Sequence, residues 1–298
     1  MTTDVRVVAS KRYGTLSPLR YPGGKAALAG LFADLICEVG IDDCTYVEPY
    51  AGGAGAGIAL LREGLVSRLV INDIDPAVHA FWQAVTLDNQ AFVDWVQRVP
   101  LTIDEWRRQR DVYRDPTNDP DVLGRAFFYL NRTNRSGVLR AGVIGGLAQT
   151  GNYKIDARFN RDTLATRLRA IGDVSSAIEV SALDGRTVIS QHATRTNTFL
   201  YIDPPYVKAG GRLYLNAFET RDHQALAAAV DMIEGAHWLM TYDNSPYIAK
   251  LYAHHAQATL DLTYSATHPG KATELLVASD IVASALGPVT AGTAPAAG

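Results

Sequence analysis

The tetrapeptide Asp203-Pro204-Pro205-Tyr206 follows directly on an apolar run, residues 198–202, that is typical of a buried strand. A strand that reaches two prolines cannot continue its hydrogen-bonded ladder, because proline has no N–H to donate. The chain must therefore leave the sheet at Asp203, with a carboxylate and an aromatic ring held beyond the strand end. In open α/β sheets ligands bind outside the strand ends, so this position favours a chemical role over a simple turn.

Strands and helices alternate along the chain. Short strands are predicted at residues 45–48, 68–73, 177–181, 198–202 and 237–242, and helices at 56–62, 76–86 and 222–234. Residues 257–264 and 274–279 are predicted to form a closing antiparallel pair. Strands separated by helices indicate a doubly wound α/β sheet with right-handed crossovers.

The composition is that of a globular chain: of 298 residues, 47% are apolar and 20% charged, which suits one α/β domain with an insertion. Residues 1–12 lack the apolar run of a secretory signal, and no apolar stretch approaches a membrane span. Cys37 and Cys44 have no CxxC spacing, so no metal site or disulfide framework is predicted. We expect a cytoplasmic protein that does not contact a membrane, with a tail, residues 287–298, that does not fold.

Positive charge is concentrated in one segment. The formal net charge is −3, but residues 122–170 contain nine Arg or Lys against two acids, which gives +7 there and −10 elsewhere. This asymmetry predicts a phosphate-binding insertion in an otherwise acidic enzyme. A solvated helix face is the alternative for residues 161–169. Glycines interrupt residues 135–158 and favour a loop or hairpin there.

A glycine-rich turn, residues 49–55, joins the strand at 45–48 to the next helix. Its glycines permit positive φ and a close approach of backbone to a ligand, and N–H groups at the helix start attract an anion. Asp73 ends the next strand twenty residues after Gly53, where an acid can accept both hydroxyls of a ribose. Asp75 is better placed than Asp73 to cap the helix that begins at Pro76. The turn and Asp73 together predict a cofactor that carries a nucleoside.

Five motifs, in this order, resemble those of the Dam-type DNA adenine N6-methyltransferases, also called the D12 class or α group. They are Tyr21-Pro22-Gly23-Gly24-Lys25, Glu48 to Gly55, Ile71 to Asp75, Tyr129 to Arg132, and Asp203-Pro204-Pro205-Tyr206. The resemblance implies an α/β fold, a Rossmann-like S-adenosylmethionine-dependent methyltransferase sheet with an inserted, mostly helical target-recognition domain. Residues 1–90 and 171–286 would form the catalytic domain, and residues 91–170 the DNA target-recognition insertion.

The resemblance also implies roles for single residues. Tyr21 and Lys25 would contact the methionine end of S-adenosylmethionine, Asp73 its ribose, and Asp184, after the strand at 177–181, its adenine amino group. The cofactor turn would be formed by Glu48, Pro49, Gly52, Gly53 and Gly55, and the product would be S-adenosylhomocysteine. Nucleic acid is predicted to bind Asn131, Arg132, Arg135, Arg140, Lys154 and Arg158.

The chemistry expected at Asp203 follows from the weakness of adenine N6 as a nucleophile, since its lone pair is delocalised into the ring. The Asp203 carboxylate and the Pro204 carbonyl would accept the amine protons, in a geometry that Pro204 and Pro205 stiffen. Tyr206 would stack on a base flipped out of the duplex. Transfer of the methyl group needs no metal.

We therefore expect methylation of adenine N6 in a specific double-stranded DNA sequence by a bacterial or phage-encoded protein. Methylation of cytosine N4 or of RNA adenine remains an alternative, because each target is an exocyclic amine on a conjugated ring. A catalytically silent DNA-binding regulator is a third interpretation. The recognition sequence, a companion restriction endonuclease and the oligomeric state are left open.

Overall fold

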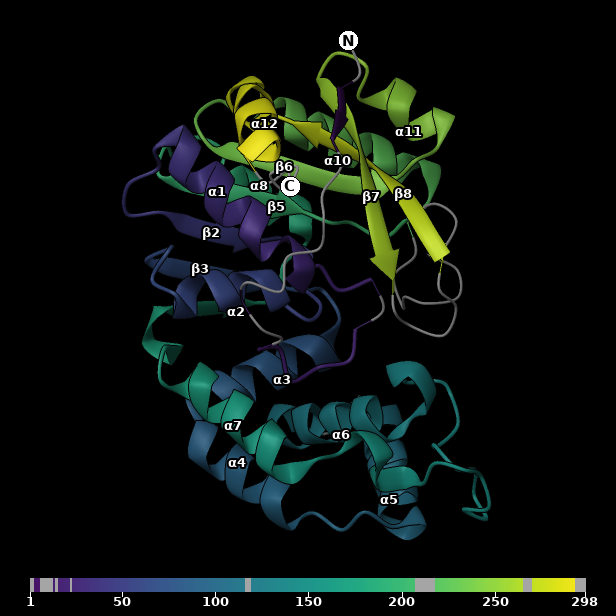
Figure 1. Cartoon of the computed structure of the whole chain (residues 1–298). Coiled ribbons are helices and arrows are strands. Elements are labelled where there is room, and N and C mark those ends of the chain that lie inside the picture. The colour runs from purple at the N-terminus through teal and green to yellow at the C-terminus, as the bar shows by residue number, and fades with distance from the viewer. Residues whose placement is uncertain are drawn as a thin grey trace, which may run out of the picture.

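The fold is an α/β sheet flanked by helices, with a helical block at one end (Figure 1). The structure, a computed structural model, describes residues 3–5, 13, 16–21, 23–115, 119–206, 218–264 and 270–292. Within these residues no helix is long and apolar enough to cross a membrane.

Eight strands form one sheet in the order β1-β7-β8-β6-β5-β2-β3-β4. They are β1 (Thr3–Val5), β2 (Thr45–Glu48), β3 (Arg68–Asn72), β4 (Ile178–Ser181), β5 (Thr198–Ile202), β6 (His237–Asp243), β7 (Ala256–Tyr264) and β8 (Gly270–Ala278). The neighbouring strands β4, β3, β2, β5 and β6 are parallel to one another, and β8 runs antiparallel to both β6 and β7. The predicted strands and the closing antiparallel pair are confirmed. The short β1, which pairs with β7, was not predicted.

The order of the strands reverses at β2. This strand pairs with β3 on one side and with β5 on the other, where Val47 lies opposite Leu200. The chain therefore builds β3 and β4 outward in one direction and β5 and β6 in the other. Such a switch point opens a crevice at the carboxyl ends of the two central strands. The glycine-rich turn after β2 and the tetrapeptide after β5 meet at this crevice.

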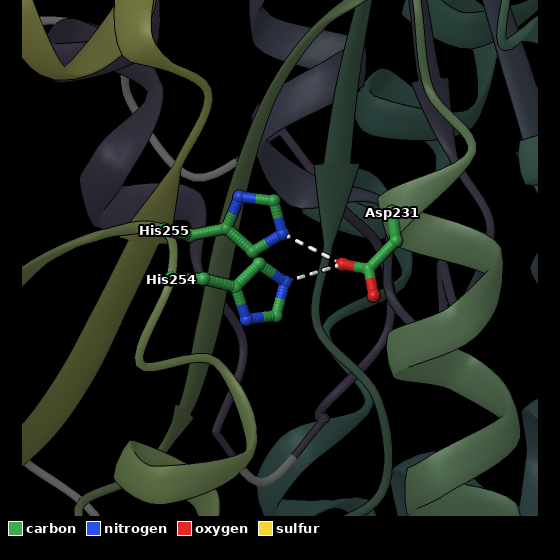
Figure 2. Close-up of side chains that lie close together, drawn as sticks. All are labelled: Asp231, His254 and His255. Carbon is green, nitrogen blue, oxygen red and sulfur yellow. Dashed lines mark hydrogen bonds and ion pairs between the residues drawn. The ribbon is translucent and has the colours of Figure 1, made fainter.

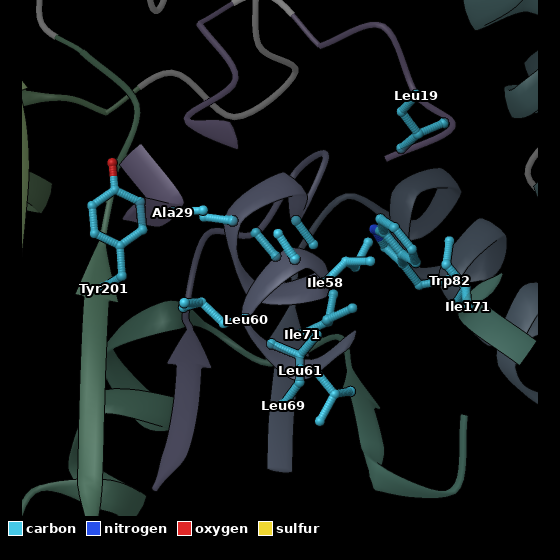
Figure 3. Packing of buried hydrophobic residues seen from close by; sticks show 14 of the residues in the cluster. Leu19, Ala29, Ile58, Leu60, Leu61, Leu69, Ile71, Trp82, Ile171 and Tyr201 are labelled. Atoms are coloured by element: carbon cyan, nitrogen blue, oxygen red, sulfur yellow. The ribbon is translucent and has the colours of Figure 1, made fainter. Parts of the chain in front are cut away.

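Helices cover both faces of the sheet. One face packs α1 (Ala29–Val39), α2 (Gly55–Arg62), α3 (Pro76–Leu87) and α12 (Asp280–Gly292), and the other packs α8 (Gly185–His192), α10 (Thr220–Asp231) and α11 (Pro246–Leu251). Side chains of the central strands alternate between the two cores: Tyr201 lies in the first, and Leu200 and Ile202 in the second. Figure 3 shows the first core, where Leu69 and Ile71 of β3 lie beside Ile58 and Leu61 of α2.

The helix α12 corrects one prediction about the tail. Residues 287–298 were expected not to fold, but α12 continues through Gly292. Val282, Ala285 and Leu286 are buried in the first core, and a helix nucleated by such packing is extended at little further cost. Residues 293–298 lie outside the described part of the chain.

Between α3 and β4, where residues 91–170 are predicted to form the insertion, the described residues form a block of four α-helices. They are α4 (Asn89–Arg98), α5 (Ile103–Arg114), α6 (Pro120–Thr133) and α7 (Arg161–Gly172). Gly124 lets α6 approach α3 closely, since a Cβ there would lie 2.6 Å from the carbonyl oxygen of Ala80. The rings of Phe81 on α3 and Phe128 on α6 stack at 5.6 Å. The block therefore shares its core with the first face of the sheet.

Candidate active site

A pocket of about 400 Å³ lies at the switch point of the sheet. The segment before α1, the turn after β2, the end of β3, the α6 region and the end of β5 all contribute to its lining. Of the predicted site residues, it is lined by Tyr21, Lys25, Glu48, Gly53, Gly55, Asp73, Asn131, Arg140, Asp203 and Pro205.

The glycines after β2 make room for another part of this chain. Gly52 has φ +46°, and a Cβ on it would lie 2.6 Å from the ring of Tyr21. A Cβ on Gly55 would lie 2.9 Å from the Cβ of Ala26. The space beside these two glycines was predicted for a ligand, but the segment before α1 fills it. The glycines thus allow Tyr21 to pack against the turn, and the two together form one side of the pocket.

Asp73 is held by two backbone donors at the edge of the pocket. Its carboxylate accepts hydrogen bonds from the N–H groups of Gly52 and Asp75, both at 2.9 Å. Burial raises the pKa of Asp73 to about 6, although these hydrogen bonds oppose the rise. Asp75, as predicted, caps α3 by accepting from the Ala77 N–H. Asp73 is therefore free of the capping role and has acceptor capacity for a ligand.

Asn72, which sequence reasoning did not select, joins three strand ends beneath the pocket. Its fully buried amide donates to the carbonyls of Pro49 and Leu183, at 2.8 and 2.9 Å. Its oxygen accepts from the Ser181 hydroxyl and from the Leu183 N–H. In the sequence, the signal that could have identified Asn72 was an amide side chain at the end of an apolar strand. Asn72 fixes the predicted cofactor residue Pro49 and the turn that precedes Asp184.

Glu48 is buried at the end of β2, between the turn and Asp203. Its carboxyl group accepts a hydrogen bond from the Gly57 N–H at 3.0 Å. Burial, with a smaller contribution from the Asp203 charge, raises the pKa of Glu48 to about 8. At neutral pH most of this carboxyl group is therefore protonated and can donate as well as accept.

The carboxylate of Asp203 lies at the centre of a hydrogen-bond network. Its Oδ1 accepts from the Tyr206 hydroxyl at 2.9 Å and from the Thr241 hydroxyl at 2.8 Å. The Lys25 ammonium bonds to Oδ1 at 3.0 Å and to Oδ2 at 2.8 Å. The Thr241 hydroxyl also bonds to that of Tyr201 at 2.7 Å. The tetrapeptide therefore carries a carboxylate whose orientation is fixed from three sides.

Lys25 is joined to a second carboxylate, that of Glu274 on β8, at 3.5 Å. Burial would lower the pKa of Lys25, but the charges of Asp203 and Glu274 outweigh it and raise that pKa. The resemblance implied that Lys25 contacts the methionine end of the cofactor, whereas here it pairs with Asp203 of the tetrapeptide. Thr241 was not predicted. The only signal for it was a hydroxyl within an apolar strand next to β5.

Tyr206 completes the network at Asp203. Its hydroxyl is 3.0 Å from the Lys25 ammonium, which also lies 5.2 Å from the centre of its ring. The ring packs against that of Tyr242, with centroids 5.9 Å apart. Pro205 lines the pocket beside Asp203.

Asp184 is placed differently from the other predicted cofactor residues. Its carboxylate caps α8 by accepting from the Arg186 N–H at 2.8 Å, and it forms an ion pair with the Arg186 guanidinium. Hydrogen bonds from that guanidinium lower the pKa of Asp184. It is absent from the described lining of the pocket, so a contact with the cofactor's adenine stays a prediction.

Two residues predicted to bind nucleic acid, Asn131 and Arg132, form hydrogen bonds that hold the fold together. Asn131 is 2% exposed, and its amide group bonds to the N–H of Arg20 at 2.8 Å and to its carbonyl at 2.9 Å. The Arg132 guanidinium donates to the carbonyls of Pro18 and Arg158. Both side chains tie α6 to neighbouring backbone, and their contact with nucleic acid stays a prediction.

The other four predicted nucleic-acid residues, Arg135, Arg140, Lys154 and Arg158, are exposed. An antiparallel bridge between Asn134 and Val143 closes the loop that carries Arg135 and Arg140. Arg140 also lines the pocket, so this loop borders the site at Asp203. This arrangement fits the predicted hairpin or loop.

Part of the positive charge in residues 122–170 has an internal role. The Arg161 guanidinium donates to the carbonyls of Val96 and Val99 at the end of α4, a favourable position for a cation. Arg167 donates to the Ser17 carbonyl at 3.2 Å. Arg161 and Arg167 therefore do not belong to a solvated helix face, which was the alternative interpretation of residues 161–169. The net positive charge of residues 122–170 is therefore larger than the positive charge that is available to bind a polyanion.

An open α/β sheet with a pocket and a fixed carboxylate at its switch point is consistent with a Rossmann-like methyltransferase. Residues 21–265 match the family of D12 class N6 adenine-specific DNA methyltransferases, and the chain belongs to this family. It is 25% identical over 221 residues to the modification methylase StsI of Streptococcus sanguinis. The matched part is 70% of this chain, but only 31% of that protein's length.

One similar solved structure is the rRNA methyltransferase aviRa from Streptomyces viridochromogenes. The match covers 87% of each chain, with 13% sequence identity and a TM-score of 0.34. A TM-score this low carries no conclusion about substrate.

Proposed function

We propose that the protein transfers a methyl group from S-adenosylmethionine to N6 of adenine in a specific double-stranded DNA sequence. The observation that carries this proposal is the fixed Asp203 carboxylate at the rim of a pocket next to the glycine-rich turn. Family membership supports adenine in DNA as the substrate class. The flipping of the base follows from the need to bring N6 to a carboxylate inside a pocket.

The residues around the pocket fit S-adenosylmethionine. The volume of about 400 Å³ is in the range of small-molecule sites. Asp73 faces it with unused acceptor capacity for ribose hydroxyls, and Tyr21 and Glu48 line the side toward Asp203. The bound cofactor would supply an activated methyl group for direct transfer. We assign the binding role to Tyr21, Glu48, Gly53, Gly55 and Asp73.

Asp203 would act on the target amine through its Oδ2 atom. Among the described residues, Oδ1 accepts from Lys25, Tyr206 and Thr241, whereas Oδ2 accepts from Lys25 alone. Oδ2 therefore has lone-pair capacity for one N6 proton, and the Pro204 carbonyl is the second acceptor. With both protons held, the lone pair of N6 is directed at the methyl carbon. Asp203 Oδ2 would then take up the proton that N6 loses when it accepts the methyl group that the bound cofactor would supply.

Tyr206 would support the flipped base, and the loop that carries Arg135 and Arg140 would hold the duplex. The ring of Tyr206 packs against Tyr242 and lies 5.2 Å from the Lys25 ammonium, so it is held beside Asp203, where an aromatic ring could stack on the adenine. Arg135 and Arg140 are exposed on a loop that borders the pocket. Guanidinium groups there can bond to phosphates or to guanine in the major groove.

The test is to incubate the protein with S-adenosylmethionine and either mixed-sequence duplex DNA or RNA. The nucleosides are then analysed by mass spectrometry after digestion. We expect N6-methyladenine from duplex DNA. If only N4-methylcytosine formed, the substrate would be cytosine N4 instead of adenine N6. If methylation were confined to RNA, the substrate would be RNA adenine. Tight DNA binding without any methylation would instead indicate a regulator.

A further inference from the structure

Three side chains that commonly bind metals meet at a surface remote from the pocket: Asp231, His254 and His255 (Figure 2). Asp231 ends α10, and the two histidines lie in the turn between α11 and β7. The Nε2 atoms of both histidines are 2.8 Å from the same oxygen, Oδ1 of Asp231. We propose that this cluster is a binding site for a divalent transition metal, of which zinc is the best fit.

The geometry is close to what three zinc ligands require. The ligand atoms all lie within 4.8 Å of one another. Zinc binds imidazole nitrogen and carboxylate oxygen at roughly 2.0–2.2 Å, in a tetrahedral arrangement. Small rotations of the side chains would therefore seat an ion among them. The ion would replace the two N–H hydrogens that now converge on one oxygen.

The histidines are already oriented for this role. The His254 and His255 rings lie 4.3 Å apart, centre to centre. The Trp238 indole packs edge-on against His255, with centroids 5.0 Å apart. Packing that fixes a ligand ring before the ion arrives reduces the ordering cost of binding.

The exposure of the cluster allows an ion to enter and keep a water ligand. The side chain of His255 is 19% exposed, that of Asp231 41% and that of His254 56%. Three protein ligands with one open position resemble the zinc sites that retain a solvent molecule. Two imidazoles with one carboxylate favour zinc and its neighbours over magnesium or calcium, which prefer oxygen ligands alone.

The position indicates a structural role, separate from methyl transfer. Trp238 lies near the amino end of β6, whereas Thr241, nearer its other end, donates to Asp203. An ion here would join the end of α10 to the start of β7. Since β7 pairs with β8, which carries Glu274, the ion would anchor the hairpin that borders the site.

The test uses the full chain without a histidine tag, titrated with zinc in competition with a chromogenic zinc chelator. We expect one saturable site, weakened at least about tenfold in each of His254→Ala, His255→Ala and Asp231→Asn, because each removes a ligand. His79→Ala, which removes a histidine from α3, is the matched control and should bind like the wild type.

Thermal unfolding without and with zinc provides a second readout and checks that each variant folds. Zinc should raise the melting temperature of the wild type and of His79→Ala, and raise that of the three ligand variants less or not at all at the same zinc concentration. The absence of saturable binding at micromolar zinc would overturn the proposal. Binding that persists unchanged in the three variants would do the same, since the ion would then lie elsewhere.

Discussion

The Lys25 ammonium bonds to both carboxylate oxygens of Asp203, although the two residues are 178 positions apart in the chain. The pair joins the motif before α1 to the tetrapeptide after β5, across the pocket. A third charge, that of Glu274, lies 3.5 Å from the same ammonium. The Asp203 carboxylate, which we propose accepts a proton of the target amine, thus belongs to a network of groups from three distant parts of the sequence.

The first prediction concerns Asp203. Asp203→Ala should lower single-turnover methylation by about a hundredfold or more, since it removes an acceptor that acts mainly in the transition state. Binding of S-adenosylmethionine and DNA should stay within a few-fold of wild type. Glu38→Ala, which removes an exposed carboxylate from α1, is the control. A rate for Asp203→Ala within tenfold of wild type would remove Asp203 from this role.

A second prediction concerns the stability that Lys25 contributes. Lys25→Met leaves the carboxylates of Asp203 and Glu274 close together in a mostly buried site, and should cost roughly 3–5 kcal/mol of unfolding free energy. Adding Glu274→Gln removes one of the two charges, so the double variant should be more stable than the sum of the single effects. Denaturant unfolding of the four proteins measures this coupling. Additivity within about 0.5 kcal/mol would show that the three charges act independently.

The strands and the switch point could be predicted from the sequence because they follow local rules. Apolar runs of strand length end in signals such as Pro204-Pro205, and alternation with helices dictates a parallel sheet. The prediction that Asp75 caps α3 was correct for the same reason: a cap depends on residues within one turn of the helix.

The parts that could not be predicted depend on contacts between distant segments. Asn131 lies within a motif and was taken for a DNA contact, yet its amide bonds to the backbone of Arg20. Gly52 was interpreted as space for a ligand, and the ring of Tyr21 fills that space. Neither partner is identifiable from sequence spacing, since each comes from a segment that packs only in the complete fold.

The third prediction is that Asp73 makes cofactor binding depend on pH. Asp73→Ala should weaken S-adenosylmethionine binding by roughly 1.5–3 kcal/mol, the scale for hydrogen bonds to a charged group. In the wild type, the pKa of Asp73 is raised by burial to about 6. Ribose hydroxyls donate to the ionised form, so affinity should be highest above pH 6 and should fall as the pH drops through 6.

Calorimetric titration between pH 5 and 8 tests this dependence, with Asp73→Asn as the matched variant because it keeps the shape but cannot ionise. The variant should bind more weakly and lose the inflection near pH 6. An inflection that persists in Asp73→Asn would assign the titration to another group. Unchanged affinity in Asp73→Ala would remove this residue from the ribose.

The last prediction separates sequence readout from structural charge in the basic segment. Arg135 and Arg140 are exposed on the loop that borders the pocket, whereas the Arg132 guanidinium is bonded to backbone carbonyls. At least one of Arg135→Ala and Arg140→Ala should relax the choice of methylated sites, since an arginine bidentate to guanine supports roughly 1–3 kcal/mol of discrimination. Arg132→Ala should lower stability and leave that choice unchanged.

Lys154 provides the contrasting case in the same experiment. As an exposed point charge it should contact phosphate, so Lys154→Ala should weaken all sites about equally and make the salt dependence shallower. Methylation of a mixed-sequence duplex library, profiled for each variant at two salt concentrations, distinguishes the two behaviours. Unchanged site preference in both arginine variants would move the readout elsewhere, for which residues 208–216, outside the described part of the chain, are the next candidate. If Lys154→Ala changed which sites are methylated, a contact with a base would instead be assigned to Lys154, at the far end of the basic segment.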